Sequence, residues 1–113
     1  MPSSAYDRLV HMRDRIGLIM ELWRGWSFAD AVADQTRWAA FERHLEVISE
    51  ASRDLPAEWK VRHGEHIPWT KVSGLGNLLR HVYHRLDGHI LWDIYENDLA
   101  ELEQSIVAML SDQ

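Results

Sequence analysis

Four polar side chains near the middle of the sequence fall on one face of a predicted helix. At about 100° per residue, they point away from an apolar stripe on the same helix. The polar residues are Asn77, Arg80, His81 and His84, and the apolar residues are Leu75, Leu78, Leu79, Val82 and Leu86. Tyr83 lies on the flank between the two sets. One helix is therefore predicted to present an amide, a guanidinium and two imidazoles on a common surface.

This polar face has the groups needed to cleave a phosphodiester bond without a metal ion. A histidine with a pKa of about 6.5 can act as general base or general acid at neutral pH. Arginine can hold the phosphate and stabilise the charge of a pentacoordinate transition state. Because RNA supplies its own nucleophile, the 2′-hydroxyl, the protein needs only to move protons and neutralise charge.

Two other interpretations of this face stay open. It could be a solvated helix surface without a function, which the pattern alone favours. It could also be a metal site, because His81 and His84 are three residues apart. Asp87, His63 and His66 are the only nearby residues that could complete such a site. With so few additional ligands, we expect neither a metal ion nor a cofactor.

Charge is unevenly distributed along the chain. The net charge of −6 argues against a nucleic-acid partner. The stretch from Lys60 to Leu86, however, has five basic side chains and one acidic side chain, so its net charge is +4 and that of the remainder is −10. This stretch also holds four of the seven histidines. It suits a local anionic ligand and makes His84, Arg85 and Lys71 phosphate-binding candidates, unless the acidic helices merely keep the protein in solution.

Length and composition narrow the class of protein. A chain of 113 residues is expected to form one domain, 1–113, around one core. The absence of cysteine excludes disulfides, a thiolate nucleophile and a cysteine zinc site. The sequence has neither an apolar signal segment nor a run of about 18 apolar residues, so we expect a cytoplasmic protein that does not contact a membrane.

Apolar residues recur every three or four positions, which predicts helices throughout the chain. The spacing predicts a first helix over about 4–24 and a second over about 34–54. Residues 28–33 are either a separate turn or an early start of the second helix. Pro56 ends the second helix or opens a short further one.

The second half of the chain continues this pattern. Residues 63–68 are expected to form a loop, and a third helix is expected over about 69–86. Asp87 is expected to cap a fourth helix, whose apolar face comprises Leu91, Tyr95, Leu99, Leu102, Ile106 and Leu110. The predicted fold is all-α, an antiparallel bundle of four to five helices.

Several segments, in order, resemble the HepT-like ribonuclease family of the HEPN superfamily. Residues 7–12 resemble the family's opening helix, and residues 44–52 resemble its Leu-Glu-x-Ile-Gly-Glu-Ala segment. Residues 67–69 and 74–83 follow its Ile-Pro-Trp and Gly-Leu-Arg-Asn-x-x-x-His-x-Tyr pattern, and Asp87 and residues 90–92 also fit. So many matches in the family's order make the resemblance specific over most of the chain.

The resemblance implies a HEPN-like bundle and a homodimer in which the motifs face each other across a cleft where RNA is cut. It implies that His81 is the catalytic histidine and that Asn77 is the polar residue of the motif. Tyr83 corresponds to the tyrosine that partner antitoxins, minimal nucleotidyltransferases, modify with AMP. Because AMP adds bulk and negative charge beside the cleft, it would repel the RNA phosphates.

At the position most serious for catalysis, the sequence departs from the family pattern. The motif places an arginine five residues before the histidine, where this chain has Gly76, so a phosphate-binding group is missing. Arg80 lies one turn later, about 40° around the helix, and its long side chain could replace the missing group.

The sequence thus predicts a metal-independent ribonuclease that is the toxin of a toxin–antitoxin pair, with RNA as its substrate. Its predicted catalytic residues are His81, Asn77 and Arg80, with help from His84 or Arg85. The first alternative is a catalytically degenerate binding or regulatory module that still pairs with a minimal nucleotidyltransferase. The second is a purely structural dimer, which the six tryptophans would favour.

Overall fold

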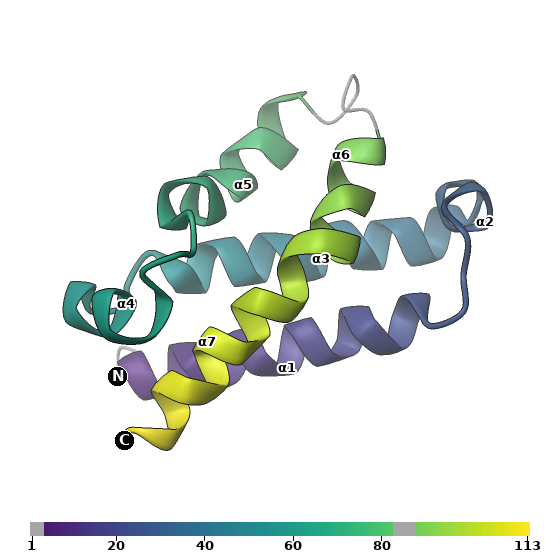
Figure 1. Ribbon diagram of the computed structural model, residues 1–113. Coiled ribbons are helices and arrows are strands. Elements are labelled where there is room, and N and C mark those ends of the chain that lie inside the picture. Colours follow the sequence, from purple (N-terminus) through teal and green to yellow (C-terminus); the bar gives the residue numbers. More distant parts are fainter. Residues whose placement is uncertain (1–3, 83–87) are drawn as a thin grey trace.

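The described part of the protein is built from helices (Figure 1). The computed structural model describes residues 4–82 and 88–113, except for the side chains of His81 and Val82. The elements in order are α1 (Ala5–Trp23), α2 (Phe28–Ala33), α3 (Gln35–Ser52), α4 (Ala57–Gly64), α5 (Trp69–Val82), α6 (Gly88–Asp93), the π-helical segment η1 (Ile94–Asp98) and α7 (Leu99–Ser111). No strand occurs within these ranges, so the predicted all-α fold is confirmed.

The first helices begin at side-chain caps. Ser4 and Asp7 form a capping box at the start of α1, in which the Asp7 N–H donates to Ser4 Oγ over 3.0 Å. Gly25, in the connection between α1 and α2, lies in the left-handed region with a φ of +79°. Asp34 accepts a 2.9 Å hydrogen bond from the Arg37 N–H and caps α3. The predicted first and second helices are therefore confirmed, and residues 28–33 form a separate short helix.

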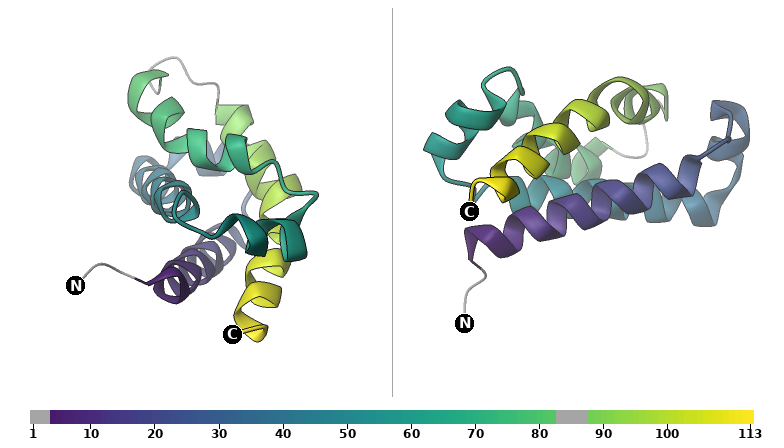
Figure 2. Two further views of the ribbon diagram at one scale, coloured as in Figure 1. Left: turned by 90° about the vertical axis from the view of Figure 1, so that its left-hand side faces the viewer. Right: turned by 60° about the horizontal axis from the view of Figure 1, so that its bottom comes forward.

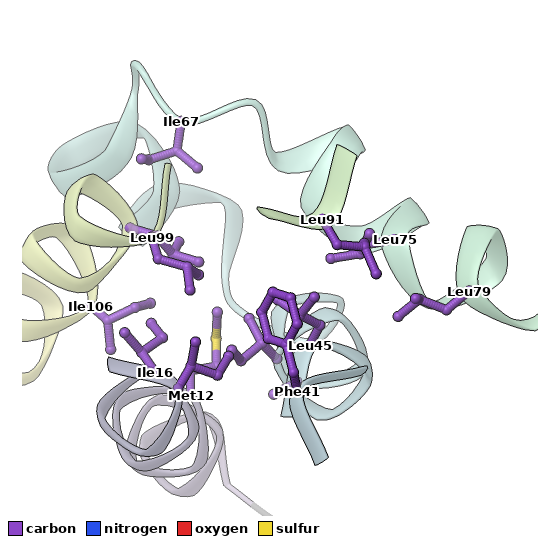
Figure 3. Close-up of a cluster of buried hydrophobic side chains, with 14 of the residues drawn as sticks. Met12, Ile16, Phe41, Leu45, Ile67, Leu75, Leu79, Leu91, Leu99 and Ile106 are labelled. Carbon is purple, nitrogen blue, oxygen red and sulfur yellow. The ribbon is translucent and has the colours of Figure 1, made fainter. Parts of the chain in front are cut away.

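The two long helices α1 and α3 run antiparallel and carry the core between them and α7 (Figures 1 and 2). Viewed along these two helices, α5 lies over α3, and α7 lies beside α1 (Figure 2). Every third or fourth side chain of α1 is fully buried, namely Leu9, Met12, Ile16, Ile19 and Trp23. Side chains from α3, α5, α6 and α7 complete this core (Figure 3). Burial of such apolar area supplies most of the favourable free energy of folding.

Two predicted elements of the second half were wrong in detail. The predicted loop 63–68 is shorter, because His63 and Gly64 form the last residues of α4. The predicted continuous fourth helix is interrupted by η1, whose wider turn rotates the residues that follow it. Of the predicted apolar face, Tyr95 within η1 and Leu110 are only half-buried, whereas Met109, which was not predicted, is fully buried.

The end of the predicted third helix lies outside the residues that the structure describes. Observed helix α5 ends at Val82, and residues 83–87, including the predicted cap Asp87, are not described. Within the described ranges, no helix is long and apolar enough to cross a membrane.

Candidate functional site

Helix α5 presents the two faces that its sequence predicted. Leu75 and Leu79 are buried against α3, whereas Asn77 and Arg80 are exposed. Trp69 fixes the start of the helix, because its Nε1–H donates a 2.8 Å hydrogen bond to the carbonyl of Gly64. The orientation of α5 therefore directs the amide of Asn77 and the guanidinium of Arg80 away from the core.

Serines join α5 to α3 along what we call the serine seam, formed by the buried Ser49 and Ser52 and the half-buried Ser73. The hydroxyl of Ser49 donates to the Ser73 carbonyl over 3.0 Å and accepts from the backbone N–H of Gly76 over 2.9 Å. Ser52 Oγ donates to the Ser49 carbonyl over 2.7 Å and lies 3.3 Å from Ser73 Oγ. Because directional hydrogen bonds reach the backbone of α5, the seam sets the rotation of this helix about its axis.

Arg80 folds back along α5 toward Gly76. A Cβ atom built on Gly76 would lie 3.4 Å from Arg80 Nη1 and 3.3 Å from Ser49 Oγ. The guanidinium therefore lies beside the position at which a side chain of residue 76 would start. The resemblance described above predicts an arginine at this position of the family pattern.

The side chain of Arg80 also lines a small groove between α1, α3 and α5. This groove of about 450 Å³ is lined by Arg8, His11, Arg43, Glu46, Val47, Glu50, Ala51 and Arg80. Arg8 pairs with Asp54 over 3.0 Å, and Arg43 pairs with Glu46. No carboxylate of the described ranges pairs with Arg80, so its guanidinium is available to an anion.

The side chains of most of the other predicted site residues are not described. His81 is part of α5, one turn after Asn77, but its side chain is outside the described part of the structure. Tyr83, His84 and Arg85 also lie outside the described residues. The structure therefore gives the position of the helix that carries His81 and the side chains of Asn77 and Arg80.

Lys71 is not brought together with Arg80. It lines a second groove, here called the apolar groove, of about 780 Å³ between α5 and the run from α6 to α7. Burial raises the pKa of Asp98 in this groove, as do the negative charges of Asp93 and Glu101, whereas Lys71 lowers it. Lys71 thus faces acidic side chains on another side of α5.

Two of the residues considered for a metal site, His63 and His66, lie in the described part of the structure. His63 Nε2 lies 3.0 Å from a carboxylate oxygen of Asp112, which also pairs with Arg62. These two partners lower the pKa of the exposed Asp112 carboxyl. His66 is exposed in the loop before α5. In the part of the chain with described side chains, no three His, Asp or Glu residues are grouped as metal ligands.

The serine seam is the feature of this site that the sequence did not predict. Ser52 occupies a place in the apolar stripe of α3, and Ser49 follows the buried Ile48. A serine at a core position must find hydrogen-bond partners when it is buried. That requirement, with Gly76 on the helix opposite, is the signal from which the seam could have been inferred.

Comparison with known proteins identifies the family. The sequence profile described as Ribonuclease HepT-like matches residues 12–109. A probable ribonuclease HepT of Thermococcus cleftensis is 34% identical over 103 residues, which cover 91% of this chain and 93% of the relative. A candidate RNase of Caldanaerobacter subterraneus subsp. tengcongensis is 32% identical over 102 residues, or 90% of each chain. No solved structure matches. The chain belongs to the HepT-like ribonuclease family.

Proposed function

We propose that this chain is a metal-independent ribonuclease, active as a homodimer, and the toxin of a toxin–antitoxin pair. Membership of the HepT-like family supports ribonuclease activity. The observation that carries the proposal for this particular chain is the exposed guanidinium of Arg80 beside Gly76, which pairs with no carboxylate of residues 4–82 and 88–113. It puts a phosphate-binding group next to the place where the family motif has arginine.

In the proposed reaction, the 2′-hydroxyl of RNA attacks the adjacent phosphorus and the 5′-oxygen of the next nucleotide leaves. The imidazole of His81 takes the proton of the 2′-hydroxyl or supplies one to the leaving oxygen. Arg80 holds the phosphate oxygens and stabilises the charge that builds up on them. The amide of Asn77, exposed on the same helix, can donate a hydrogen bond to the same phosphate. His84 and Arg85, which follow His81 in the sequence, would add positive charge.

The activity is tested by incubating purified protein with RNA in the presence of a metal chelator. We expect cleavage by the wild type and a loss of about 100-fold or more in His81→Ala, because a general acid or base is removed. The matched control is His66→Ala, which removes an exposed histidine outside α5. RNA with a 2′-deoxy group at the cut position should stay intact, because it lacks the nucleophile. Equal cleavage by His81→Ala and the wild type would refute the assignment of His81.

The homodimer is proposed to form over the apolar groove, with a second copy of this chain as the occupant. The groove's floor and walls include Leu45, Leu75 and Leu78, and Ile90 at its edge is 48% exposed. Acidic side chains of α6 to α7 line one wall and Lys71 of α5 lines the other, so a second copy related by a two-fold axis could place its Lys71 against these acidic side chains. Apolar area and complementary charge therefore both favour a second copy.

Light scattering tests this assembly directly. We expect a dimer for the wild type and a shift toward monomer for Ile90→Glu, which puts a charge into the groove. Val107→Glu is the matched control, because Val107 is also about half exposed, at 46%, but does not line the groove. A monomeric wild type, or equal dimerisation of both variants, would contradict the proposal.

The partner is proposed to be a minimal nucleotidyltransferase that attaches AMP to Tyr83, as the family resemblance implies. Tyr83 follows two residues after His81 in the sequence, so AMP would bring negative charge close to the proposed site. Mass spectrometry after co-expression with a nucleotidyltransferase encoded beside this chain should detect the added AMP, and Tyr83→Phe should prevent it. If the nucleotidyltransferase inhibits cleavage while Tyr83 stays unmodified, the proposed attachment of AMP to Tyr83 is refuted.

Gly76 supports a second candidate function, a binding module that has lost catalysis. A chain without the motif arginine could keep its assembly and its nucleotidyltransferase partner while leaving RNA uncut. The two functions differ in growth. Arrest of growth on expression that disappears in His81→Ala supports the ribonuclease, whereas arrest unaffected by this substitution supports the binding module.

A further inference from the structure

The space beside Gly76 is shared by two side chains. Ser49 Oγ and Arg80 Nη1 would lie 3.3 and 3.4 Å from a Cβ at residue 76, and Ser49 Cβ would lie 3.7 Å away. Distances of 3.3 to 3.4 Å are tighter than ordinary Cβ contacts. A longer side chain at position 76 must therefore leave the helix through space that these two residues already fill.

Of the two neighbours, Ser49 cannot move aside at low cost. It is 1% exposed, and its hydroxyl is engaged with both Ser73 and Gly76. Shifting it would leave a buried backbone N–H and a buried hydroxyl without their partners, which is costly. Arg80, in contrast, is exposed on a long flexible side chain and can be displaced into solvent.

The two departures from the quoted family pattern meet at this contact. The pattern has glycine where this chain has Ser49, and arginine where this chain has Gly76. In the structure, the Ser49 hydroxyl accepts the Gly76 N–H over 2.9 Å. The two changes are thus physically linked, since the serine takes up room on α3 that a side chain on α5 would need.

We propose that Ser49, Gly76 and Arg80 form one coupled unit. Ser49 is a positioning residue. Its hydroxyl accepts a hydrogen bond from the Gly76 N–H and so holds α5, and its side chain fills the space into which a side chain at position 76 would extend. The guanidinium that binds the RNA phosphate is supplied from Arg80, one turn later. The inference rests on the proposed function, because it names the group that binds the RNA backbone there.

The consequence is that the guanidinium can be moved back to position 76 only if Ser49 is removed. The starting variant is Arg80→Gln, which deletes the charge and keeps much of the side chain. Onto it are added Gly76→Arg alone, Ser49→Gly alone, or both together. Ser49→Gly with Arg80→Gln is the matched control, since it opens the space without adding a guanidinium.

The probe is a single-stranded RNA whose nucleotides carry 2′-O-methyl groups, so that it binds without being cut. We expect Arg80→Gln to weaken binding about tenfold, the effect of losing one charge-assisted contact. The slope of log affinity against log salt should fall by about 0.7. Gly76→Arg on this background should bind no better. Adding Ser49→Gly as well should raise the affinity above that of both variants and bring back the slope, although the lost hydrogen bonds of Ser49 keep the affinity below that of the wild type. Ser49→Gly without the new arginine should restore neither.

Cleavage of unmodified RNA separates this inference from the proposed function. A wild type that binds RNA but does not cut it refutes the ribonuclease. The affinities of the Arg80→Gln variants then still test whether an arginine at position 76 can replace Arg80 only when Ser49 is removed. A wild type that cuts RNA, with an Arg80→Gln variant that binds and cuts equally well, refutes the coupled unit alone. Full recovery by Gly76→Arg with Ser49 in place also refutes it, and failure of the wild type to bind RNA refutes both proposals.

Folding of every variant is checked by its melting temperature. Should the variant with all three changes fail to fold, the pair Arg80→Gln and Gly76→Arg/Arg80→Gln decides the question. Equal RNA affinity of these two variants supports the proposal that Ser49 prevents an arginine at position 76 from reaching the RNA. A higher RNA affinity of the second variant overturns it.

Discussion

The two ends of α3 are held by different kinds of contact. At one end lies an aromatic cluster, here called the aromatic end, formed by Trp23, Trp26, Trp38, Phe41 and Trp92. The ring of Trp23 is fully buried, and its centroid lies between 5.6 and 6.0 Å from those of the other four. At the other end lies the serine seam, where small side chains and a glycine bring α5 close to α3.

The two regions differ in the interaction that holds them together, which is buried apolar area in one and hydrogen bonding in the other. The aromatic end relies on buried area, and no described residue accepts a hydrogen bond from the Trp23 indole N–H. The seam buries little area, but its hydroxyls and backbone groups are paired with good geometry. The first region should therefore determine stability, and the second should determine the orientation of α5 and its polar face.

Trp23→Ala should have the largest effect on stability. Removal of a fully buried indole loses its transfer free energy and leaves a cavity, at a cost of about 3–5 kcal/mol. Urea unfolding followed by circular dichroism measures this cost. The control is Leu18→Ala in the same helix, whose side chain is 51% exposed and whose loss should change stability by less than about 1 kcal/mol. Similar costs for both would show that the aromatic end is not the main source of stability.

Ser49→Ala should have a smaller effect on stability and a clear effect on the polar face. The substitution removes the acceptor of the Gly76 N–H and the donor to the Ser73 carbonyl, which should cost about 1–3 kcal/mol. RNA affinity of the folded variant should also fall, because α5 can rotate. Ser111→Ala, which removes an exposed hydroxyl that also bonds to a carbonyl, is the control. An unchanged RNA affinity in Ser49→Ala would show that the seam does not orient the site.

Much of this contrast could be predicted from apolar periodicity alone. Apolar spacing predicted helix α1, and the wheel of the third helix separated the buried Leu75 and Leu79 from the exposed Asn77 and Arg80. These predictions succeed because a 3.6-residue period and burial are local properties of one helix. The sequence could not decide whether Trp23 belongs to the core or to an interface, and the structure buries it completely.

Contacts between helices were harder to predict. The hydrogen bond from Gly76 to Ser49 joins residues 27 positions apart, and no pattern within either helix indicates it. The π turn at Ile94–Asp98 was missed because the apolar spacing on both sides of it still resembles an α-helix. The guanidinium of Arg80 lies near Gly76 because of the conformation of the Arg80 side chain, and helical spacing does not determine that conformation.

The glycines of α5 give a sharper comparison within one helix. A Cβ at Gly74 would meet nothing within 4 Å, so Gly74→Ala should raise stability by about 0.5–1 kcal/mol through helix propensity. Gly76→Ala should gain less or nothing, because its Cβ meets Ser49 and Arg80. Thermal unfolding measures both, and Gly17→Ala in α1, also with open space, serves as the control for propensity. Equal gains at positions 74 and 76 would show that the seam tolerates a larger side chain.

The smallest expected effect concerns His44, on α3 between the two regions. Burial and then the positive charge of Arg15 hold the pKa of His44 below its ordinary value of 6.5, and Arg15 Nη1 lies 3.2 Å from His44 Nδ1. Below pH 6.5 the unfolded chain takes up a proton that the folded His44 does not, so this residue's contribution to stability is present above 6.5 and is lost as the pH falls toward the folded pKa.

Unfolding in urea at several pH values measures this dependence. His44→Asn should lose less stability than the wild type when the pH is lowered through 6.5. Arg15→Gln keeps the histidine but removes the charge, so an NMR titration should find the pKa of His44 raised in this variant relative to the wild type, yet still below 6.5 because burial is the larger cause. A pKa in Arg15→Gln equal to that in the wild type would mean that Arg15 does not influence this histidine. It would also show that the middle of α3, like its aromatic end, responds to burial alone.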